Sequence, residues 1–298
     1  MHTYIIPTTS AEHIAKKIVG VPDFEVIIPE GNKEGMRRFP DGEIYTRIPR
    51  LNELKDKTVV LHSGGSDRNS SYVELDQVLE ILYEENLPFR HGPLEVFFTY
   101  FAYGGQDKVF QKGETNFAER IVRRLTKYYR VDGIYVIDAH FADEEWMRRY
   151  PIKNVSALSL LKETASIDYP NTDILYLAPD VGSQKRTGLM GADKKRIDSY
   201  NVEIQTSKQL ATAVKGRVVG VADDMIRTGK TMVGFRDACI RYGASEVIAL
   251  CTHGVMEPGI KLIQENFPRL YLANTIDRPE ANVDVTDLVV QTIRRRIL

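Results

Sequence analysis

Short apolar segments rich in branched and aromatic residues recur along the whole chain, and amphipathic stretches of helical length separate them. We predict strands at seven of these segments: 58–63, 94–103, 133–139, 174–179, 217–222, 246–252 and 270–275. The clearest helical patterns lie at 72–84, 117–129, 231–242, 259–266 and 285–295. Strands that are apolar nearly throughout and alternate with helices are typical of a parallel sheet covered on both faces. The alternation therefore predicts an α/β protein.

The length of 298 residues allows one large domain or two ordinary ones. An internal echo favours two. The segment LEVFF at 94–98 is followed one helix later by GIYVID at 133–138, and SEVIAL at 245–250 is followed in the same way by RLYLAN at 269–274. Because Pro151 follows Tyr150 between these halves, we place the boundary there and predict domains 1–150 and 151–298.

Composition excludes several classes of protein. The 40 Lys and Arg residues balance 41 Asp and Glu, so no net charge attracts nucleic acid or an anionic membrane. No apolar run approaches the ~20 residues of a membrane span. The two cysteines, Cys239 and Cys251, stand among apolar residues, which favours packing over reactivity and fits a reducing cytosol. The N-terminus shows no export signal, so we expect a cytoplasmic protein with no nucleic-acid or membrane partner.

Polar residues gather directly after the predicted strands. Ligands of open α/β sheets bind beyond the carboxyl ends of the strands, so these residues are the candidates for a functional site. They are Gln106, Asp107, Asp138, His140, Asp180, Asp223, Asp224 and His253.

The most informative segment is VVGVADDMIRTGKT at 218–231, where a strand ends in two carboxylates and a Thr/Gly loop opens a helix. Such a loop can direct backbone N–H groups and the hydroxyls of Thr228 and Thr231 at a phosphate. Asp223 and Asp224 suit the vicinal hydroxyls of a sugar, directly or through Mg²⁺. A structural alternative is an acidic turn with a helix cap. A Walker A loop is excluded, because that motif needs glycine where Asp224 stands.

This segment resembles the phosphoribosyl pyrophosphate (PRPP) loop of type I phosphoribosyltransferases and PRPP synthetases. Seven further segments resemble motifs of PRPP synthetases, also called ribose-phosphate pyrophosphokinases, and they follow the order of that family from residue 38 to residue 276. They are RFPDGEIY at 38–45, YGGQDK at 103–108, DAH at 138–140, PDVG at 179–182, KKR at 194–196, THGVM at 252–256 and ANTI at 273–276.

The resemblance implies two tandem type I phosphoribosyltransferase-like domains, each a mainly parallel sheet flanked by helices, with the active site between them. It implies transfer of the diphosphoryl group of Mg·ATP to the 1-hydroxyl of ribose 5-phosphate, giving PRPP and AMP, in a homodimer or larger homo-oligomer. The implied catalytic residues are Lys194 and Arg196, on a mobile loop. The implied metal-binding residues, for Mg²⁺, are His140 and Asp180.

The resemblance also assigns the substrate sites. The implied nucleotide-binding residues are Phe39, Asp41, Glu43, Gln106, Asp107 and His140, with loop 39–43 completing the site of a neighbouring subunit. The implied ribose-phosphate-binding residues are Asp223, Asp224, Arg227, Thr228, Gly229, Lys230 and Thr231.

Each residue taken singly also has a structural interpretation. His140 and His253 could be core histidines, and Asp180 could cap a helix or turn. Residues 194–196 could form a solvated basic face. The ordered set of motifs favours the functional interpretation.

Three features depart from the family pattern. Gly105 stands where the family has an ATP-binding arginine, for which Lys108 or Arg120 could compensate. Arg227 and Lys230 add two cations beside the phosphate loop. The stretch from Asp180 to Lys194 is too short for the helix and strand that the family usually places there.

These departures leave three hypotheses, in order of preference. The first is an active PRPP synthetase. The second is a type I phosphoribosyltransferase that uses PRPP, which would leave loop 39–43 and His140 without a purpose. The third is a catalytically weak homologue that regulates a synthetase, for which the loss of arginine at Gly105 is the best argument.

Overall fold

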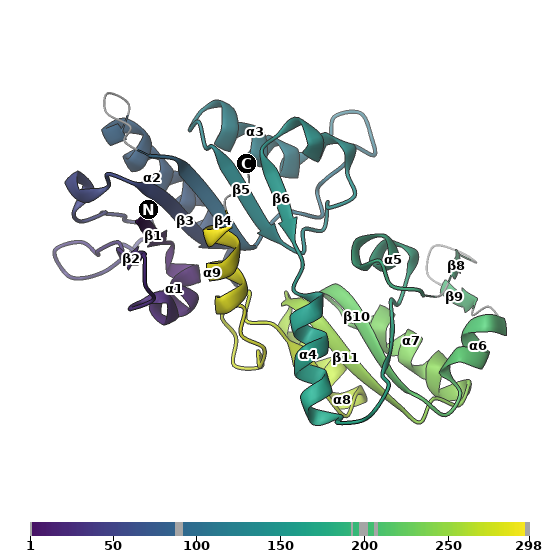
Figure 1. Ribbon diagram of the computed structural model, residues 1–298. Coiled ribbons are helices and arrows are strands. Elements are labelled where there is room, and N and C mark those ends of the chain that lie inside the picture. The colour runs from purple at the N-terminus through teal and green to yellow at the C-terminus, as the bar shows by residue number, and fades with distance from the viewer. Residues whose placement is uncertain (1, 87–91, 192, 197–201, 206–207, 296–298) are drawn as a thin grey trace. The chain divides into compact units, whose positions relative to one another are not determined.

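The computed structural model describes residues 2–86, 92–191, 193–196, 202–205 and 208–295 (Figure 1). The chain divides into two compact units, one comprising Met1–Val155 and Thr286–Leu298, the other Ser156–Val285. We predicted a single boundary at residue 150. In the structure, β6 (Ile152–Val155) and α9 (Thr286–Arg294), which we assigned to the second domain, belong to the first unit.

The reason lies in the contacts of α9, the yellow helix of Figure 1, which packs against α1 (Glu12–Ile18). The ammonium of Lys57 also donates a hydrogen bond to the carbonyl of Ile293 at 3.1 Å, and the Arg294 guanidinium donates to the carbonyl of Pro22 at 3.0 Å. The C-terminal helix is therefore fixed on the N-terminal unit.

The first unit contains a six-stranded, wholly parallel sheet with the strand order β2-β1-β3-β4-β5-β6. The strands besides β6 are β1 (Thr3–Pro7), β2 (Phe24–Val26), β3 (Lys57–Ser63), β4 (Leu94–Tyr100) and β5 (Gly133–Ile137). The connecting helices besides α1 are η1 (Thr9–Ala11), η2 (Leu51–Glu53), α2 (Arg68–Asn86), α3 (Phe117–Lys127) and η3 (Glu145–Arg149).

The second unit contains a four-stranded parallel sheet, ordered β12-β11-β10-β7, and a separate antiparallel pair. The sheet strands are β7 (Leu175–Leu177), β10 (Val218–Ile226), β11 (Glu246–Gly254) and β12 (Leu270–Leu272), and the pair is β8 (Asp193–Arg196) with β9 (Val202–Gln205). The helices are α4 (Leu158–Asp168), α5 (Val181–Thr187), α6 (Lys208–Val214), α7 (Lys230–Arg241) and α8 (Glu257–Asn266). The predicted α/β class with parallel sheets flanked by helices is confirmed.

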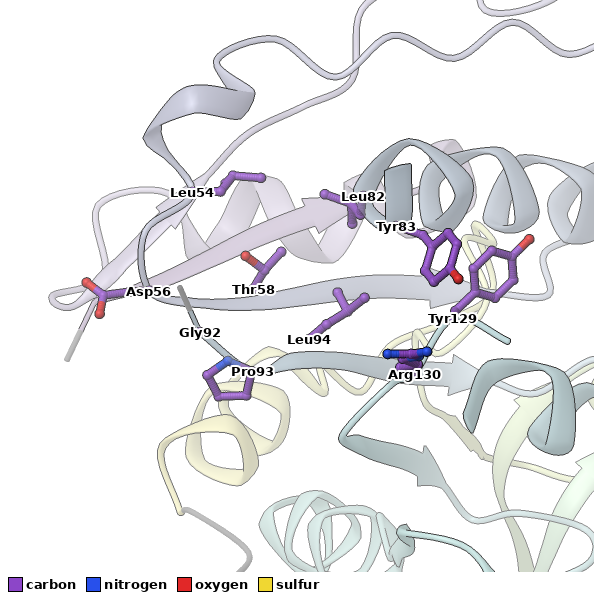
Figure 2. A pocket seen from close by; sticks show the side chains of 10 residues that line it. All are labelled: Leu54, Asp56, Thr58, Leu82, Tyr83, Gly92, Pro93, Leu94, Tyr129 and Arg130. Atoms are coloured by element: carbon purple, nitrogen blue, oxygen red, sulfur yellow. The ribbon is translucent and has the colours of Figure 1, made fainter. Parts of the chain in front are cut away.

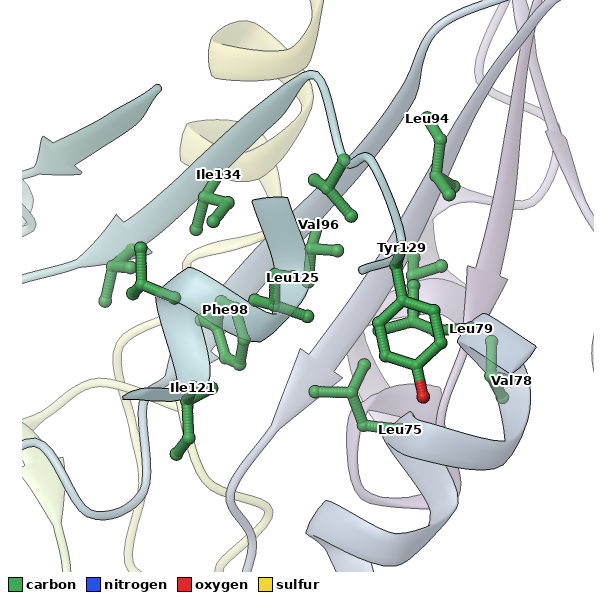
Figure 3. Close-up of a cluster of buried hydrophobic side chains, with 14 of the residues drawn as sticks. Leu75, Val78, Leu79, Leu94, Val96, Phe98, Ile121, Leu125, Tyr129 and Ile134 are labelled. Carbon is green, nitrogen blue, oxygen red and sulfur yellow. The ribbon is translucent and has the colours of Figure 1, made fainter. Parts of the chain in front are cut away.

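The core of the first unit forms where α2 and α3 pack on the sheet (Figure 3). Leu75 and Leu79 of α2, Phe98 of β4 and Leu125 of α3 are all at least 97% buried and belong to one cluster. Helix α3 begins at an N-cap, because the Asn116 side chain accepts a hydrogen bond from the backbone N–H of Glu119 at 2.9 Å. The cap therefore fixes the start of a helix that carries part of the core.

Strand length is unequal in the second sheet. β10 and β11 have nine residues each, whereas the edge strands β7 and β12 have three each. β7 pairs with β10 only at Val219, Gly220 and Val221. The carboxyl-terminal part of β10 therefore extends beyond its β7 partner, and α5 contacts it there.

His62 is a buried histidine of β3, only 2% exposed, and its Nδ1 lies 3.0 Å from the hydroxyl of Thr8. Burial lowers the pKa of His62 to about 3. An unfolded histidine titrates near ~6.5, so as the pH falls below that value the unfolded chain binds a proton that the folded chain does not. The stabilising effect of the neutral ring is thus complete above the unfolded pKa and is lost as the pH falls toward the folded value.

We predict that the wild type loses ~2 kcal/mol more unfolding free energy than His62→Gln between about pH 7 and about pH 5. Glutamine keeps a polar group near Thr8 but does not titrate. Urea unfolding at the two pH values measures the difference. Parallel acid sensitivity of the two proteins would contradict the assignment of a neutral His62.

Candidate functional site

Two adjacent carboxylates lie on the part of β10 that extends beyond β7. Asp224 is buried, at 3% exposure, and Asp223 is next to it in the chain with its side chain 12% exposed. The backbone N–H of Asp224 donates to Oδ1 of Asp223 at 2.9 Å. On the other side of the strand, Asp223 is in register with Cys251 of β11. The predicted pair is thus placed at a strand end, but largely out of solvent.

Helix α5 supplies the partners of this acid pair. The Arg186 guanidinium lies against Oδ1 of Asp224, with Nε at 3.0 Å and Nη2 at 2.8 Å. The Ser183 hydroxyl donates to Oδ1 of Asp223 at 2.6 Å, and Nη2 of Arg186 lies 3.7 Å from the same oxygen. Sequence reasoning missed both residues. A signal was present, since Ser183 and Arg186 stand three residues apart on one face of a short helix that follows a predicted strand.

Burial and repulsion act together on the acid pair. Burial raises the pKa of Asp223 well above its ordinary value, and the neighbouring charge of Asp224 raises it further, while Ser183 and Arg186 oppose the shift. Burial also raises the pKa of the Cys251 thiol, with a smaller effect from the two carboxylates. Cys251 and Cys239 are both buried, as expected for packing residues. A strongly perturbed carboxylate at a strand end is a mark of a functional site.

Asp180 is the N-cap of α5, and its Oδ1 accepts a hydrogen bond from the backbone N–H of Ser183 at 2.9 Å. The capping interpretation is therefore confirmed, and the predicted metal-binding role stays a prediction. The stretch that follows Asp180 holds one short helix, since α5 spans only seven residues and ends at Gly188, which has a positive φ of 69°.

The predicted phosphate loop joins β10 to α7. Arg227, Thr228 and Lys230 are exposed, and Gly229 is the N-cap of α7 with a φ of 73°. A β-carbon at Gly229 would lie 2.8 Å from the carbonyl oxygen of Gly259, in the first turn of α8. Thr231 lies in the first turn of α7 and is partly exposed. The loop is thus open to solvent on one side and closely packed on the other, and glycine is required where it packs.

The predicted catalytic residues Lys194 and Arg196 lie in β8, where their backbones pair with Ile204 and Val202 of β9. Their side chains lie outside the described residues, as does the segment 197–201. Their catalytic roles therefore stay predictions.

In the first unit, the structure brings two predicted nucleotide segments together. A β-carbon at Gly104 would lie 3.5 Å from Cβ of His140, so the loops after β4 and β5 are in contact. Both loops hold a residue other than glycine at positive φ, Tyr103 at 64° and Asp138 at 36°. Such backbone conformations cluster at functional sites. Gln106 is exposed, and His140 is partly buried.

Lys108 was one candidate to replace the missing arginine at Gly105. Its ammonium instead forms an ion pair with Oε1 of Glu144 at 2.7 Å, and that hydrogen bond raises the pKa of Lys108. The charge of Lys108 is therefore already engaged within its own unit. Arg120, the other candidate, is exposed on α3.

The predicted nucleotide loop 39–43 is the tip of a hairpin. The N–H of Phe39 donates to the carbonyl of Glu43 at 2.8 Å, and Gly42 turns the chain with a φ of 97°. Phe39 is 37% exposed and meets the ring of Tyr45 edge to face. Asp41 and Glu43 are exposed. The hairpin thus presents all three predicted residues to solvent.

The base of this hairpin is fixed by Glu74 of α2, which is 4% exposed. Its carboxylate accepts hydrogen bonds from the backbone and the hydroxyl of Thr9, and it pairs with the guanidinium of Arg37. The next residue, Arg38, pairs with Asp67 where both side chains are about half exposed.

Two cavities of the first unit lie at opposite ends of its sheet. One of about 260 Å³ opens at the carboxyl ends of β1 and β3, beneath the hairpin base, and is lined by Ser10, Arg37, Gly65 and Glu74 among others. The other, of about 180 Å³, opens near the amino ends of β3 and β4, as Figure 2 shows around Thr58 and Leu94. Ligands of parallel sheets bind at carboxyl ends, so the second cavity has no place in the candidate site. None of the predicted nucleotide residues lines either cavity.

His253 is buried, and its Nδ1 lies 2.9 Å from the hydroxyl of Thr275, which agrees with its structural interpretation. Among the described residues, no group of three or more His, Cys, Asp or Glu side chains could hold a metal ion. No helix in the described part of the chain is long and apolar enough to cross a membrane.

Comparison with known proteins places this chain in a family. No protein-family model matches it. It is 27% identical over 300 residues to ribose-phosphate pyrophosphokinase 2 of Archaeoglobus fulgidus, covering 97% of this chain and 99% of that protein. It is 30% identical over 262 residues to the ribose-phosphate pyrophosphokinase of Thermococcus kodakarensis, covering 84% of this chain and 88% of that protein.

The fold agrees with this relationship. The crystal structure of phosphoribosylpyrophosphate synthetase from Mycobacterium smegmatis matches with a TM-score of 0.77 and 21% identity, covering 99% of this chain and 98% of that one. The tandem phosphoribosyltransferase-like α/β fold that we predicted is therefore confirmed. Together with the sequence relationship, it shows that this chain belongs to the ribose-phosphate pyrophosphokinase family.

We predict that Glu74→Gln destabilises the first unit by about 1–3 kcal/mol, because it weakens a buried, charge-assisted network that includes Arg37. Arg38→Gln is the matched control, since an exposed ion pair contributes less than about 1 kcal/mol. Urea unfolding measures both, and proteolysis should cut Glu74→Gln faster within 28–47. Equal effects of the two variants would contradict the role of Glu74 as the anchor of the hairpin.

Proposed function

We propose that this protein forms PRPP and AMP from Mg·ATP and ribose 5-phosphate. The observation that carries the proposal is the continuous strand, loop and helix that bears the Asp223–Asp224 pair and then an exposed loop ending at the N-cap Gly229. The relatives that match nearly the whole length of the chain are named ribose-phosphate pyrophosphokinases. An acid pair followed by a phosphate loop suits a sugar phosphate, with hydroxyls at one end and phosphate at the other.

The second unit would bind ribose 5-phosphate. Asp223 and Asp224 would accept hydrogen bonds from the ribose hydroxyls. The 5-phosphate would lie at the start of α7, where backbone N–H groups point outward and the helix dipole favours an anion. Its binding residues would be Arg227, Thr228, Gly229, Lys230 and Thr231.

The first unit would bind ATP. Gln106, Asp107 and His140 would contact the nucleotide from the loops after β4 and β5. The hairpin presents three residues to solvent at its tip: Phe39, Asp41 and Glu43. They would contact the adenine of the ATP bound to a neighbouring subunit. The proposed enzyme is therefore a homodimer or a larger homo-oligomer.

The reaction forms a bond between the 1-hydroxyl oxygen of the sugar and the β-phosphorus of ATP. The bond from that phosphorus to the bridging oxygen of AMP breaks, AMP leaves, and the hydroxyl proton is released. Charge neutralisation and positioning are the main requirements of such a transfer. Lys194 and Arg196 would stabilise the negative charge of the transferred phosphates.

Bound Mg²⁺ would neutralise phosphate oxygens and hold the diphosphoryl group in one geometry. The donor set suits an ion carried by the nucleotide, because Mg²⁺ typically takes one or two carboxylates and completes its shell with phosphate oxygens and water. Asp180 would supply such a carboxylate in the second unit. His140 would contact the metal-bound nucleotide in the first unit.

Phosphorus NMR on the purified protein incubated with Mg·ATP and ribose 5-phosphate tests the proposal. We expect PRPP and AMP to appear together in equal amounts. Intact ATP after prolonged incubation would overturn the proposal. Consumption of PRPP with a nucleobase would then favour a phosphoribosyltransferase, and stimulation of a second synthetase would favour a regulatory subunit.

We predict that Lys194→Ala lowers kcat by about 100-fold or more and raises the KM for ribose 5-phosphate far less. The reason is that the Lys194 ammonium would act on charge that develops in the transition state. Lys195→Ala makes the same chemical change one residue away and should stay within about threefold of the wild type. Steady-state kinetics separates the two parameters. Equal losses in kcat and affinity would show that β8 does not carry the catalytic cation.

We predict that Gly105→Arg lowers the KM for ATP about tenfold, since it restores a guanidinium beside the nucleotide segment while Lys108 remains paired with Glu144. Gln111→Arg adds the same charge elsewhere in the exposed loop and should leave the KM nearly unchanged. If both variants bind ATP alike, the missing arginine at position 105 has no specific role.

A further inference from the structure

Arg186 differs from the other described cations of the candidate site because it is largely buried. Its side chain is 14% exposed, whereas Arg227 and Lys230 belong to the exposed loop. It comes from α5, 37 positions before Asp223 in the chain, and reaches the acid pair on β10.

The contacts from α5 converge on one oxygen of each carboxylate. Nε and Nη2 of Arg186 approach Oδ1 of Asp224, at 3.0 and 2.8 Å. Ser183, the backbone N–H of Asp224 and Arg186 all approach Asp223 at Oδ1, at 2.6, 2.9 and 3.7 Å. These contacts fix the planes of both carboxylates.

The arrangement also offsets a charge problem. Two adjacent carboxylates with little exposure repel each other, and each loses hydration. A guanidinium stays protonated at any physiological pH and presents a rigid set of donors. Arg186 therefore compensates the pair with a cation of the chain itself, and the helix that carries it is held by the Asp180 cap.

We propose that Arg186 is a positioning residue that makes this protein selective for sugar phosphates with an intact vicinal diol. It would hold Asp223 and Asp224 in the orientation in which both can accept hydrogen bonds from adjacent hydroxyls of the sugar. A 2-deoxy sugar phosphate lacks one of these hydroxyls, so the oriented pair would contribute less to its binding affinity. The inference rests on the proposed function, because it concerns the sugar that the acid pair binds.

The test is a binding cycle between protein variants and two sugars. Calorimetry measures the Kd of ribose 5-phosphate and of 2-deoxyribose 5-phosphate, without ATP, for the wild type and for Arg186→Gln. We expect the wild type to prefer the ribose compound by about 10- to 100-fold, as a hydrogen bond to a charged group implies. Arg186→Gln should raise the Kd of ribose 5-phosphate about 10- to 100-fold and the Kd of the deoxy compound less than about threefold.

Three further variants make the cycle specific. Lys185→Gln removes an exposed positive charge from the next position of the same helix and should change neither Kd by more than about twofold. Arg186→Lys should recover part of the selectivity, because it restores the charge without the planar fork. Ser183→Ala, which removes the 2.6 Å bond to Asp223, should reduce selectivity by about threefold to tenfold and serves if Arg186→Gln does not fold.

An equal rise in the Kd of both sugars for Arg186→Gln would overturn the inference. Such a result would indicate a general loss of structure, which affects both sugars alike. Unchanged selectivity would also overturn it. The proposed function fails separately. If the wild type binds ribose 5-phosphate selectively but forms no PRPP, the catalytic proposal is wrong and the role of Arg186 stands. If it binds neither sugar, both are wrong.

Discussion

The different lengths of β7 and β10 determine the candidate site. β7 ends at Leu177, so the last residues of β10 extend past it and need another neighbour. α5 provides one, because Asp180 caps it three residues after β7 and its first turns contact β10. The acid pair therefore faces a helix on one side and β11 on the other. The same strand then runs directly into the phosphate loop.

Burying an acid pair has a cost that the surrounding structure must offset. Removing a carboxylate from water without partners is strongly unfavourable, and two adjacent carboxylates also repel. Ser183, Arg186 and the backbone of Asp224 reduce this cost at Asp223. A buried pair held by these contacts is less able to move than an exposed one. The structure thus trades stability for a fixed arrangement of oxygen atoms, which a sugar-binding site can use.

Sequence patterns predicted much of the fold, since all seven expected strands and all five expected helices are present. They did not single out β1, β2 or β6, which have five, three and four residues. Local motifs also located Asp180, Asp223 and the loop at Gly229. Arg186 was missed for a different reason. Its partners lie 37 and 38 positions away, and only the packing of α5 beside β10 brings them together.

The departures from the family pattern that the resemblance implies have opposite charge in the two units. In the second unit they are added cations at Arg227 and Lys230, both exposed on the predicted phosphate loop. In the first unit the departure is an expected arginine replaced by Gly105, and the nearby ammonium of Lys108 is held by Glu144. The net charge of −1 conceals this difference, because it sums over positions that act separately. Under the proposed function, phosphate attraction would be strengthened where the sugar binds and weakened where ATP binds. ATP affinity would then depend more on the exposed ring of Phe39 and on Mg²⁺ than on a guanidinium.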